Sequence, residues 1–177
     1  MAVIAVMLCG CGAHARNAAP KPGAVAAALK GSPPALASLH ASANQLLAGS
    51  SAVFRAQLER LRGYPVVVNK WASWCGPCQT EFAAFQVASV SYGRRVAFLG
   101  VDGKDSDAAA RAFLKRFPVS YPSYADPDES IARMIQAATY YPQTVYFDRQ
   151  GTIVYDHAGP YESAQALDRD IRRYVLG

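Results

Sequence analysis

A run of β-branched residues that leads into two closely spaced cysteines constrains this chain more than any other feature. Residues 66–68 are three valines, and such a run is typical of a strand that is covered on both faces. The chain then passes through Trp71 and reaches Cys75-Gly-Pro-Cys78, where a helix is expected to begin. A helix N-terminus stabilises a thiolate through unpaired main-chain N–H groups and the positive end of its dipole. We therefore expect Cys75 to be a nucleophile and Cys78, one turn later, to resolve a mixed disulfide.

The rest of the pattern predicts an α/β chain in the order strand, helix, strand, helix, hairpin, helix. The expected helices are 51–62, a segment from the cysteines to 93, 108–117, one that starts near 126–130, and 163–176. The expected strands are 66–68, 96–101, 122–125 and the antiparallel hairpin 144–148 with 152–156. The length of 177 residues suits one domain and a leader.

The N-terminal stretch differs in composition from the rest. Residues 2–8 are apolar, and an Ala-, Pro- and Gly-rich stretch follows. We interpret residues 1–34 as an export leader with a flexible linker and residues 35–177 as the domain. The segment around Cys11 is similar to the bacterial lipoprotein cleavage box, which would make Cys11 the lipid-bearing residue and tether the domain to a membrane. The alternative is a disordered cytosolic extension.

Charge and cysteine usage exclude other classes. The net charge is +5, but the basic residues are scattered, so no nucleic acid partner is expected. The four cysteines fall into two close pairs, which implies no structural disulfide framework. A zinc site needs a second ligand pair, and the sequence has none with that spacing, so we expect no metal.

The sequence Trp71-Ala-Ser-Trp-Cys-Gly-Pro-Cys-Gln-Thr-Glu-Phe82 resembles the active-site segment of the TlpA/ResA-like branch of exported thioredoxin-fold proteins. The resemblance extends over about 36–177. It implies a thioredoxin-like fold, with a central mixed β-sheet flanked by helices, a C-terminal β-hairpin and a closing helix. It also implies a thiol-disulfide oxidoreductase that works outside the cytoplasm and needs no cofactor.

Residues 139–151 resemble the second marker of that branch, a proline before the hairpin with a cis peptide bond in front of it. The marker maps onto Pro142, preceded by Tyr141. We expect the Tyr141-Pro142 loop to bind an extended substrate beside the thiols, together with Trp74, Gly76 and Pro77. The alternative is an ordinary turn proline.

Glu81 lies three residues after Cys78 and therefore on the same side of the helix. The resemblance implies a proton relay to Cys78 through a partly buried acid with a raised pKa, and the alternative is a solvated carboxylate. Asn69 stands where cytoplasmic thioredoxins carry an acid, which shifts proton handling toward Glu81. Lys70 replaces the usual aromatic residue, so it should face solvent or extend its ammonium group to the surface.

The leading prediction is a protein that reduces disulfides of exported proteins such as apocytochrome c. Its Gly76-Pro77 pair is that of reducing thioredoxins. A membrane thiol-disulfide electron donor would reduce its disulfide again at the outer face of a bacterial cytoplasmic membrane. The alternatives are an extracytoplasmic dithiol oxidase or isomerase, a copper metallochaperone that uses His157 with the thiols, and a thiol peroxidase.

Overall fold

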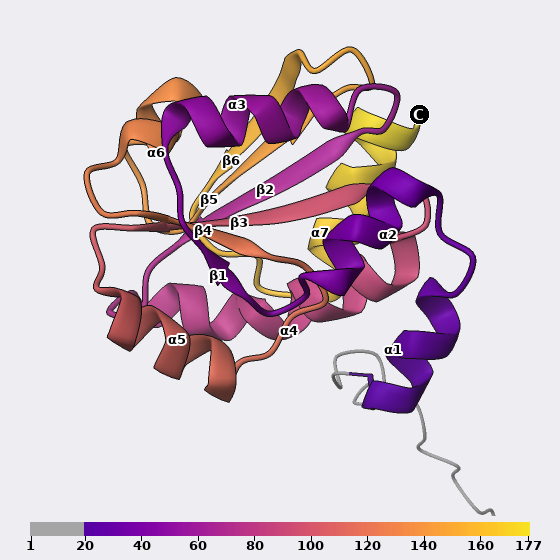
Figure 1. Cartoon of the computed structure of the whole chain (residues 1–177), viewed down its shortest axis with the longest axis horizontal. Coiled ribbons are helices and arrows are strands. Elements are labelled where there is room, and N and C mark those ends of the chain that lie inside the picture. Colours follow the sequence, from indigo (N-terminus) through magenta and orange to yellow (C-terminus); the bar gives the residue numbers. More distant parts are fainter. Residues whose placement is uncertain (1–19) are drawn as a thin grey trace, which may run out of the picture.

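A six-stranded sheet with helices on both faces forms the body of the protein (Figure 1). The computed structural model describes residues 20–177, so the apolar run 2–8 and the predicted lipidation site Cys11 lie outside the described residues. The helices are α1 (Pro22–Leu29), α2 (Pro34–Ala41), α3 (Ser51–Arg60), α4 (Gly76–Tyr92), α5 (Asp107–Arg116), α6 (Ser130–Met134), α7 (Ala164–Ile171) and a π-helical turn (Arg172–Leu176). The strands are β1 (Leu46–Leu47), β2 (Val66–Trp71), β3 (Ala97–Gly103), β4 (Ser123–Asp126), β5 (Gln143–Phe147) and β6 (Ile153–Ala158).

Strand β2 lies inside the sheet, whose order is β1-β4-β3-β2-β5-β6. It pairs in parallel with β3 on one side and antiparallel with β5 on the other, so the predicted mixed sheet is confirmed. All of its residues are buried, which explains why the sequence there is continuously apolar at its start. The predicted hairpin is also confirmed, because β5 and β6 pair antiparallel.

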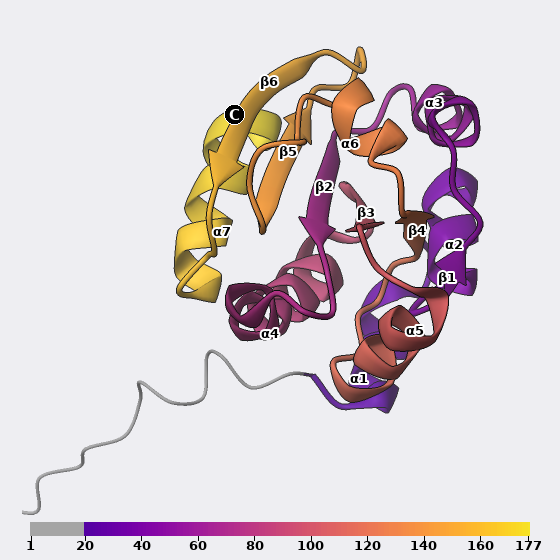
Figure 2. The ribbon, with the colours of Figure 1, turned by 90° about the vertical axis from the view of Figure 1, so that its left-hand side faces the viewer.

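Each face of the sheet carries its own hydrophobic core. Val67 and Trp71 point to the face covered by α4, α5 and α7, where Phe82 and Phe113 pack against Trp71. Val66 and Val68 point to the other face, which α2, α3 and α6 cover. Figure 2 shows α4 and α7 on one side of the sheet and α3 on the other. Alternate residues of β2 therefore reach opposite cores, and the strand ends at the N-terminus of α4.

The segment that precedes the domain contains more structure than the sequence suggested. Residues 20–34 were expected to be flexible linker, but α1 lies within them, and Pro22 occupies its first turn. Its alanine-rich sequence favours a helix once a surface is present to pack on. A Cβ atom on Gly93, at the end of α4, would come within 2.7 Å of the Leu29 side chain, so α1 contacts the domain. The boundary at residue 34 stays a prediction.

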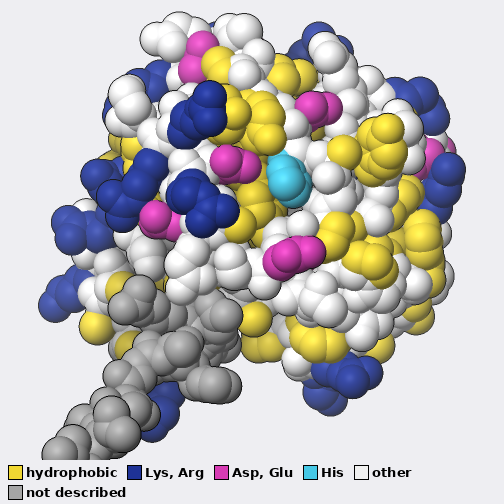
Figure 3. Space-filling model, turned by 180° about the vertical axis from the view of Figure 1, so that it is seen from behind, with side chains coloured by type: hydrophobic (Ala, Val, Ile, Leu, Met, Phe, Trp, Pro, Cys, Tyr) yellow, Lys and Arg dark blue, Asp and Glu magenta, His cyan; other side chains and the backbone are white. Residues whose placement is uncertain are grey.

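Helix length and surface charge bear on possible membrane and nucleic acid contacts. Within residues 20–177 no helix is both long and apolar enough to cross a membrane. On the face shown in Figure 3, Lys and Arg side chains occupy several separate places, with Asp and Glu side chains between them. The expectation of no nucleic acid partner stays a prediction.

Candidate active site

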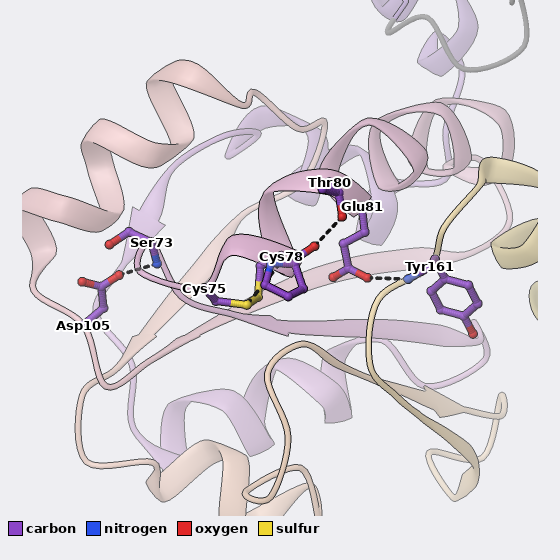
Figure 4. The surroundings of a disulfide bond; sticks show 8 residues. Ser73, Cys75, Cys78, Thr80, Glu81, Asp105 and Tyr161 are labelled. Atoms are coloured by element: carbon purple, nitrogen blue, oxygen red, sulfur yellow. Dashed lines mark hydrogen bonds between the residues drawn. A yellow bond between two sulfur atoms is a disulfide. The ribbon is translucent and has the colours of Figure 1, made fainter.

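Cys75 and Cys78 form a disulfide at the N-terminus of α4, with sulfur atoms 2.08 Å apart (Figure 4). Cys75 is the N-cap of the helix, and its sulfur accepts a hydrogen bond from the Cys78 main-chain N–H at 3.1 Å. Cys75 is 4% exposed and Cys78 is fully buried, while Gly76 and Pro77 between them are exposed. The two cysteines thus lie together at the predicted helix start, and Cys75 is the more exposed of the two, while their catalytic roles stay a prediction. Its position allows the helix N-terminus to stabilise a thiolate.

The turn before Cys75 is fixed by the loop that follows β3. The Ser73 amide donates a hydrogen bond to the Asp105 carboxylate at 2.6 Å. The Trp74 indole N–H donates to the Lys104 carbonyl at 2.9 Å. Both contacts join segments about thirty residues apart, and spacing alone gave no signal for them. They hold the main chain that carries the nucleophile.

Glu81 is a fully buried carboxyl group on α4. Its Oε2 atom accepts a hydrogen bond from the Tyr161 amide at 3.1 Å, and Figure 4 shows the side chain reaching from α4 to that amide. Burial raises its pKa to about 8, although the hydrogen bond from Tyr161 acts in the opposite direction. The alternative of a solvated carboxylate is therefore wrong. A carboxyl group with a pKa of about 8 can both accept and return a proton near neutral pH.

A group of buried polar side chains surrounds Glu81. Asn69 and Thr144 are partners in the register of β2 and β5, so they point to the same face as Glu81. Burial raises the pKa of Tyr121, and the Asn69 amide acts in the opposite direction there, as it does on Glu81. Among residues 20–177, the atoms here without a hydrogen-bond partner are both side-chain polar atoms of Asn69, Oε1 of Glu81 and the hydroxyl groups of Tyr121 and Thr144. These atoms can therefore form further hydrogen bonds beside Glu81.

The Tyr141-Pro142 peptide bond is cis, as predicted. The Tyr141 ring lies against Trp74, with the ring centroids 4.7 Å apart. Because Trp74 directly precedes Cys75, the contact brings the loop before β5 to the thiol pair. The structure thus brings Tyr141, Trp74 and the cysteines together, while their role in substrate binding stays a proposal.

Lys70 differs from its prediction, because it is fully buried and neither faces solvent nor extends to it. Its ammonium group lies 3.0 Å from the Glu129 carboxylate and 3.6 Å from the centre of the Tyr141 ring. Burial lowers the pKa of Lys70, and the Glu129 carboxylate opposes that effect. Burial would raise the pKa of Glu129, but hydrogen bonds from Lys104, Tyr141 and Lys70 hold it at about 2. The charges are therefore compensated inside the protein.

The copper alternative places His157 with the thiols, but the contacts of His157 are with Tyr161 and Asp170. Its ring stacks on Tyr161 with centroids 4.1 Å apart, and its Nδ1 atom is 3.9 Å from Asp170. In the part of the chain that the structure describes, no group of three or more His, Cys, Asp or Glu side chains could hold a metal ion. The three-ligand arrangement of the copper alternative does not form.

The fold and this site define a thioredoxin-fold protein with a dithiol at a helix N-terminus. The profile of the AhpC/TSA family matches residues 47–156. The thioredoxin-like protein YneN of Bacillus subtilis is 29% identical over 66% of this chain and 71% of its own length. The thiol:disulfide interchange protein DsbE of Allochromatium vinosum is 33% identical over 66% of this chain and 65% of its own.

A solved structure of a related protein has the same fold. The structure of Mycobacterium tuberculosis DsbF superposes with a TM-score of 0.59 at 31% identity, over 64% of this chain and 82% of that one. The chain belongs to the AhpC/TSA family and is of the thiol-disulfide oxidoreductase type that includes ResA, TlpA and DsbE. The alignments with three curated relatives cover between 50% and 71% of the length of those proteins.

Proposed function

We propose that this protein reduces disulfides of exported proteins, apocytochrome c among them, through the Cys75–Cys78 dithiol. The observation that carries the proposal is the position of Cys75 as N-cap of α4, with Cys78 one turn behind it and Glu81 buried on the same helix. The names of the relatives, which include thiol:disulfide interchange proteins, support exchange between protein disulfides.

The first step is attack by the Cys75 thiolate on one sulfur of a substrate disulfide. A new sulfur–sulfur bond joins Cys75 to the substrate, and the second substrate sulfur leaves as a thiolate that takes up a proton. The N-terminus of α4 stabilises the attacking thiolate, and the Cys78 N–H donates a hydrogen bond to the Cys75 sulfur. The slight exposure of Cys75 lets the substrate reach it.

The second step is resolution by Cys78. Glu81 in its ionised form accepts the proton of the Cys78 thiol, and the thiolate then attacks Cys75. The mixed disulfide breaks, the substrate leaves with its second thiol, and the protein holds the Cys75–Cys78 disulfide. Two electrons pass from the protein to the substrate. The raised pKa of Glu81, about 8, suits this exchange of one proton.

The substrate segment would dock on the surface around the thiol pair. Trp74 is 55% exposed and packs against Tyr141, and Gly76 and Pro77 are exposed beside the disulfide. The loop at Tyr141 and Pro142 precedes β5 and supplies main-chain groups next to this surface. An extended peptide could pair with that main chain while its cysteine meets Cys75.

The partner that restores the dithiol would be a membrane thiol-disulfide electron donor, since each turnover leaves the protein oxidised. We place the protein outside the cytoplasm, at the outer face of a bacterial cytoplasmic membrane, with Cys11 as lipid tether. The leader sequence supports this placement. Metabolic labelling with a fatty acid, compared between the wild-type chain and Cys11→Ser, tests the tether.

The cysteine variants test the proposed activity. Cys75→Ser should abolish insulin reduction, while Cys78→Ser should accumulate a mixed disulfide with the substrate that is visible on a non-reducing gel. Full turnover by both variants would overturn the proposal. The direction of electron flow is tested by equilibrating Cys75–Cys78 with a glutathione series. A potential below about −220 mV supports a reductant, and a value near −120 mV favours the oxidase or isomerase alternative.

A further inference from the structure

Trp74 and Tyr141 belong to a closed ring of contacts next to the disulfide. The Trp74 indole donates to the Lys104 carbonyl, and the Lys104 ammonium group lies 2.8 Å from Glu129 Oε2. Glu129 Oε1 accepts from the Tyr141 hydroxyl at 2.7 Å, and the Tyr141 ring packs against Trp74 with the two planes tilted by 51°. Each aromatic ring is therefore fixed by a polar contact as well as by the other ring.

Lys70 adds a buried cation to this closed set of contacts. Its ammonium group contacts the Tyr141 ring and shares Glu129 Oε1 with the Tyr141 hydroxyl. A buried cation in this place holds both the plane of the ring and the position of its hydroxyl. Lys70 lies on β2 and Glu129 precedes α6, so the ring is attached to two separate elements of the core.

Three residues next to these contacts have backbone conformations or a size that few residue types allow. Lys104 and Glu129 both have positive φ, at 51° and 57°, a backbone conformation that residues other than glycine rarely adopt. A Cβ atom on Gly103 would lie 2.3 Å from the Tyr141 hydroxyl, so glycine is required for that hydroxyl to approach β3. The end of β3 with the residue after it, and the residue before α6, thus accept small size or unusual backbone geometry to hold one aromatic pair.

We propose that Trp74 and Tyr141 form an aromatic platform that selects substrates with an aromatic side chain beside the reacting cysteine, and that Lys70 and Glu129 are the positioning residues of this platform. The inference rests on the proposed function. Trp74 offers a half-exposed ring to a peptide bound at Cys75. A cationic side chain gains less there, because Lys70 already occupies a place on the Tyr141 ring and Lys104 is exposed beside it.

The platform can be tested with short peptides whose single cysteine is a mixed disulfide with 2-mercaptoethanol. The residue next to the cysteine is Phe, Ala or Lys, in one series before it and in another after it. The reduced protein is mixed with each peptide, and the second-order rate constant is measured by acid quench and chromatography of the released peptide thiol. Hydroxyethyl disulfide serves as the small reference substrate, and each peptide rate is divided by that rate.

Wild-type protein should prefer Phe over Ala by about three- to tenfold in at least one series, as expected for one aromatic contact, and should not prefer Lys over Ala. Lys70→Met should reduce the Phe preference to less than about twofold. It retains a side chain of similar length and leaves Glu129 with Lys104 and Tyr141 as donors. Lys115→Met, on the exposed face of α5, should retain the wild-type preference.

Tyr141→Phe provides a second variant in case Lys70→Met does not fold. It keeps the ring and loses only the hydroxyl bond to Glu129, so its Phe preference should fall to between those of wild type and Lys70→Met. A wild-type protein that reacts with hydroxyethyl disulfide but does not discriminate between Phe and Ala overturns the inference and leaves the proposed function standing. An unchanged preference in both platform variants also overturns it. A wild-type protein that reduces none of the disulfides overturns both.

Discussion

The Glu81 carboxyl group accepts a hydrogen bond from the main-chain amide of Tyr161, although the two residues are 80 positions apart. This bond ties the helix that carries the cysteines to the loop after β6. Since the donor is a backbone group, it directs the carboxyl group without adding a titrating partner. The buried acid of this site is thus positioned by the C-terminal part of the fold.

Glu81→Gln should slow the resolution of the mixed disulfide. In the wild type the ionised fraction of Glu81 rises through its pKa of about 8, so resolution should accelerate across that pH. The amide cannot accept the Cys78 proton, and the rate at pH 7.5 should fall on the order of a hundredfold. Rapid-quench measurement of substrate release between pH 6 and 10 checks this. A pH profile that is the same in both proteins would contradict a proton relay.

Asp102→Asn should make the protein more stable at alkaline pH. Asp102 is 2% exposed at the end of β3, and burial, with the negative charge of Asp105 adding to it, raises its pKa from 3.8 to about 8. A raised folded-state pKa contributes stability that is complete below the unfolded value and is lost as pH rises to the folded value. From pH 5 to 8.5 the free energy of unfolding should shift in favour of the variant by roughly 2 to 4 kcal/mol.

Urea denaturation of the oxidised protein at the two pH values measures this shift. Glu162→Gln, which removes an exposed carboxylate in the loop after β6, is the control and should show little pH-dependent change. Equal behaviour of the two variants would show that Asp102 is ionised in the folded protein at neutral pH.

Tyr161→Phe should destabilise the protein without altering the proton relay. The Tyr161 hydroxyl hydrogen-bonds to Tyr146 at 2.7 Å and to Asp170 at 2.6 Å, and both bonds are lost in the variant. The expected cost is about 1 to 3 kcal/mol, since buried partners are left unpaired. The amide that binds Glu81 remains, so the pH profile of resolution should not move. Tyr140→Phe, at a residue that is 53% exposed, is the matched control in the same denaturation experiment.

The parts of the site that lie close in sequence could be predicted. Cys75, Cys78 and Glu81 share one helix, so helical spacing alone places them together. Pro142 was predicted only through the resemblance of its flanking residues to a known marker, and the cis bond confirms that assignment. Local patterns and a shared motif therefore reach the dithiol and the residues that flank it.

The contacts made by Lys70 could not be predicted, because they depend on side chains from distant loops. A lysine in a strand is expected to reach solvent, and only the fold shows that Glu129, 59 residues away, compensates its charge. Helix α1 was missed for a different reason, since its proline and alanine content resembles that of a linker. For Lys70 tertiary packing overrides the local preference, whereas for α1 it supplies the surface on which an alanine-rich segment forms a helix.

Gly100→Ala should disrupt the core beside the site. An added Cβ would lie 2.1 Å from the Ser123 hydroxyl and 3.0 Å from the Trp71 indole nitrogen. These two groups are hydrogen-bonded to each other and buried, so neither can move away without losing the bond. The expected loss is about 1 to 3 kcal/mol, measured by the denaturation midpoint. Gly23→Ala in α1, where an added Cβ meets nothing within 4 Å, should be neutral or stabilising.

Asn69→Asp should shift the proton relay to higher pH. Asn69 is fully buried, and its polar amide lowers the pKa of Glu81, against the larger effect of burial. An ionised carboxylate in its place removes the effect of the amide and adds a like charge, and both changes raise the pKa of Glu81 above its value of about 8. The inflection in the rate of mixed-disulfide resolution should move up by about one pH unit or more, and the rate at pH 7 should fall about tenfold. Gln150→Glu adds the same charge at an exposed hairpin position and should leave the profile unchanged. If Asn69→Asp resolves the mixed disulfide faster at pH 7 than the wild type, the new carboxylate has itself become the base, and Glu81 is then not the required proton acceptor of this site.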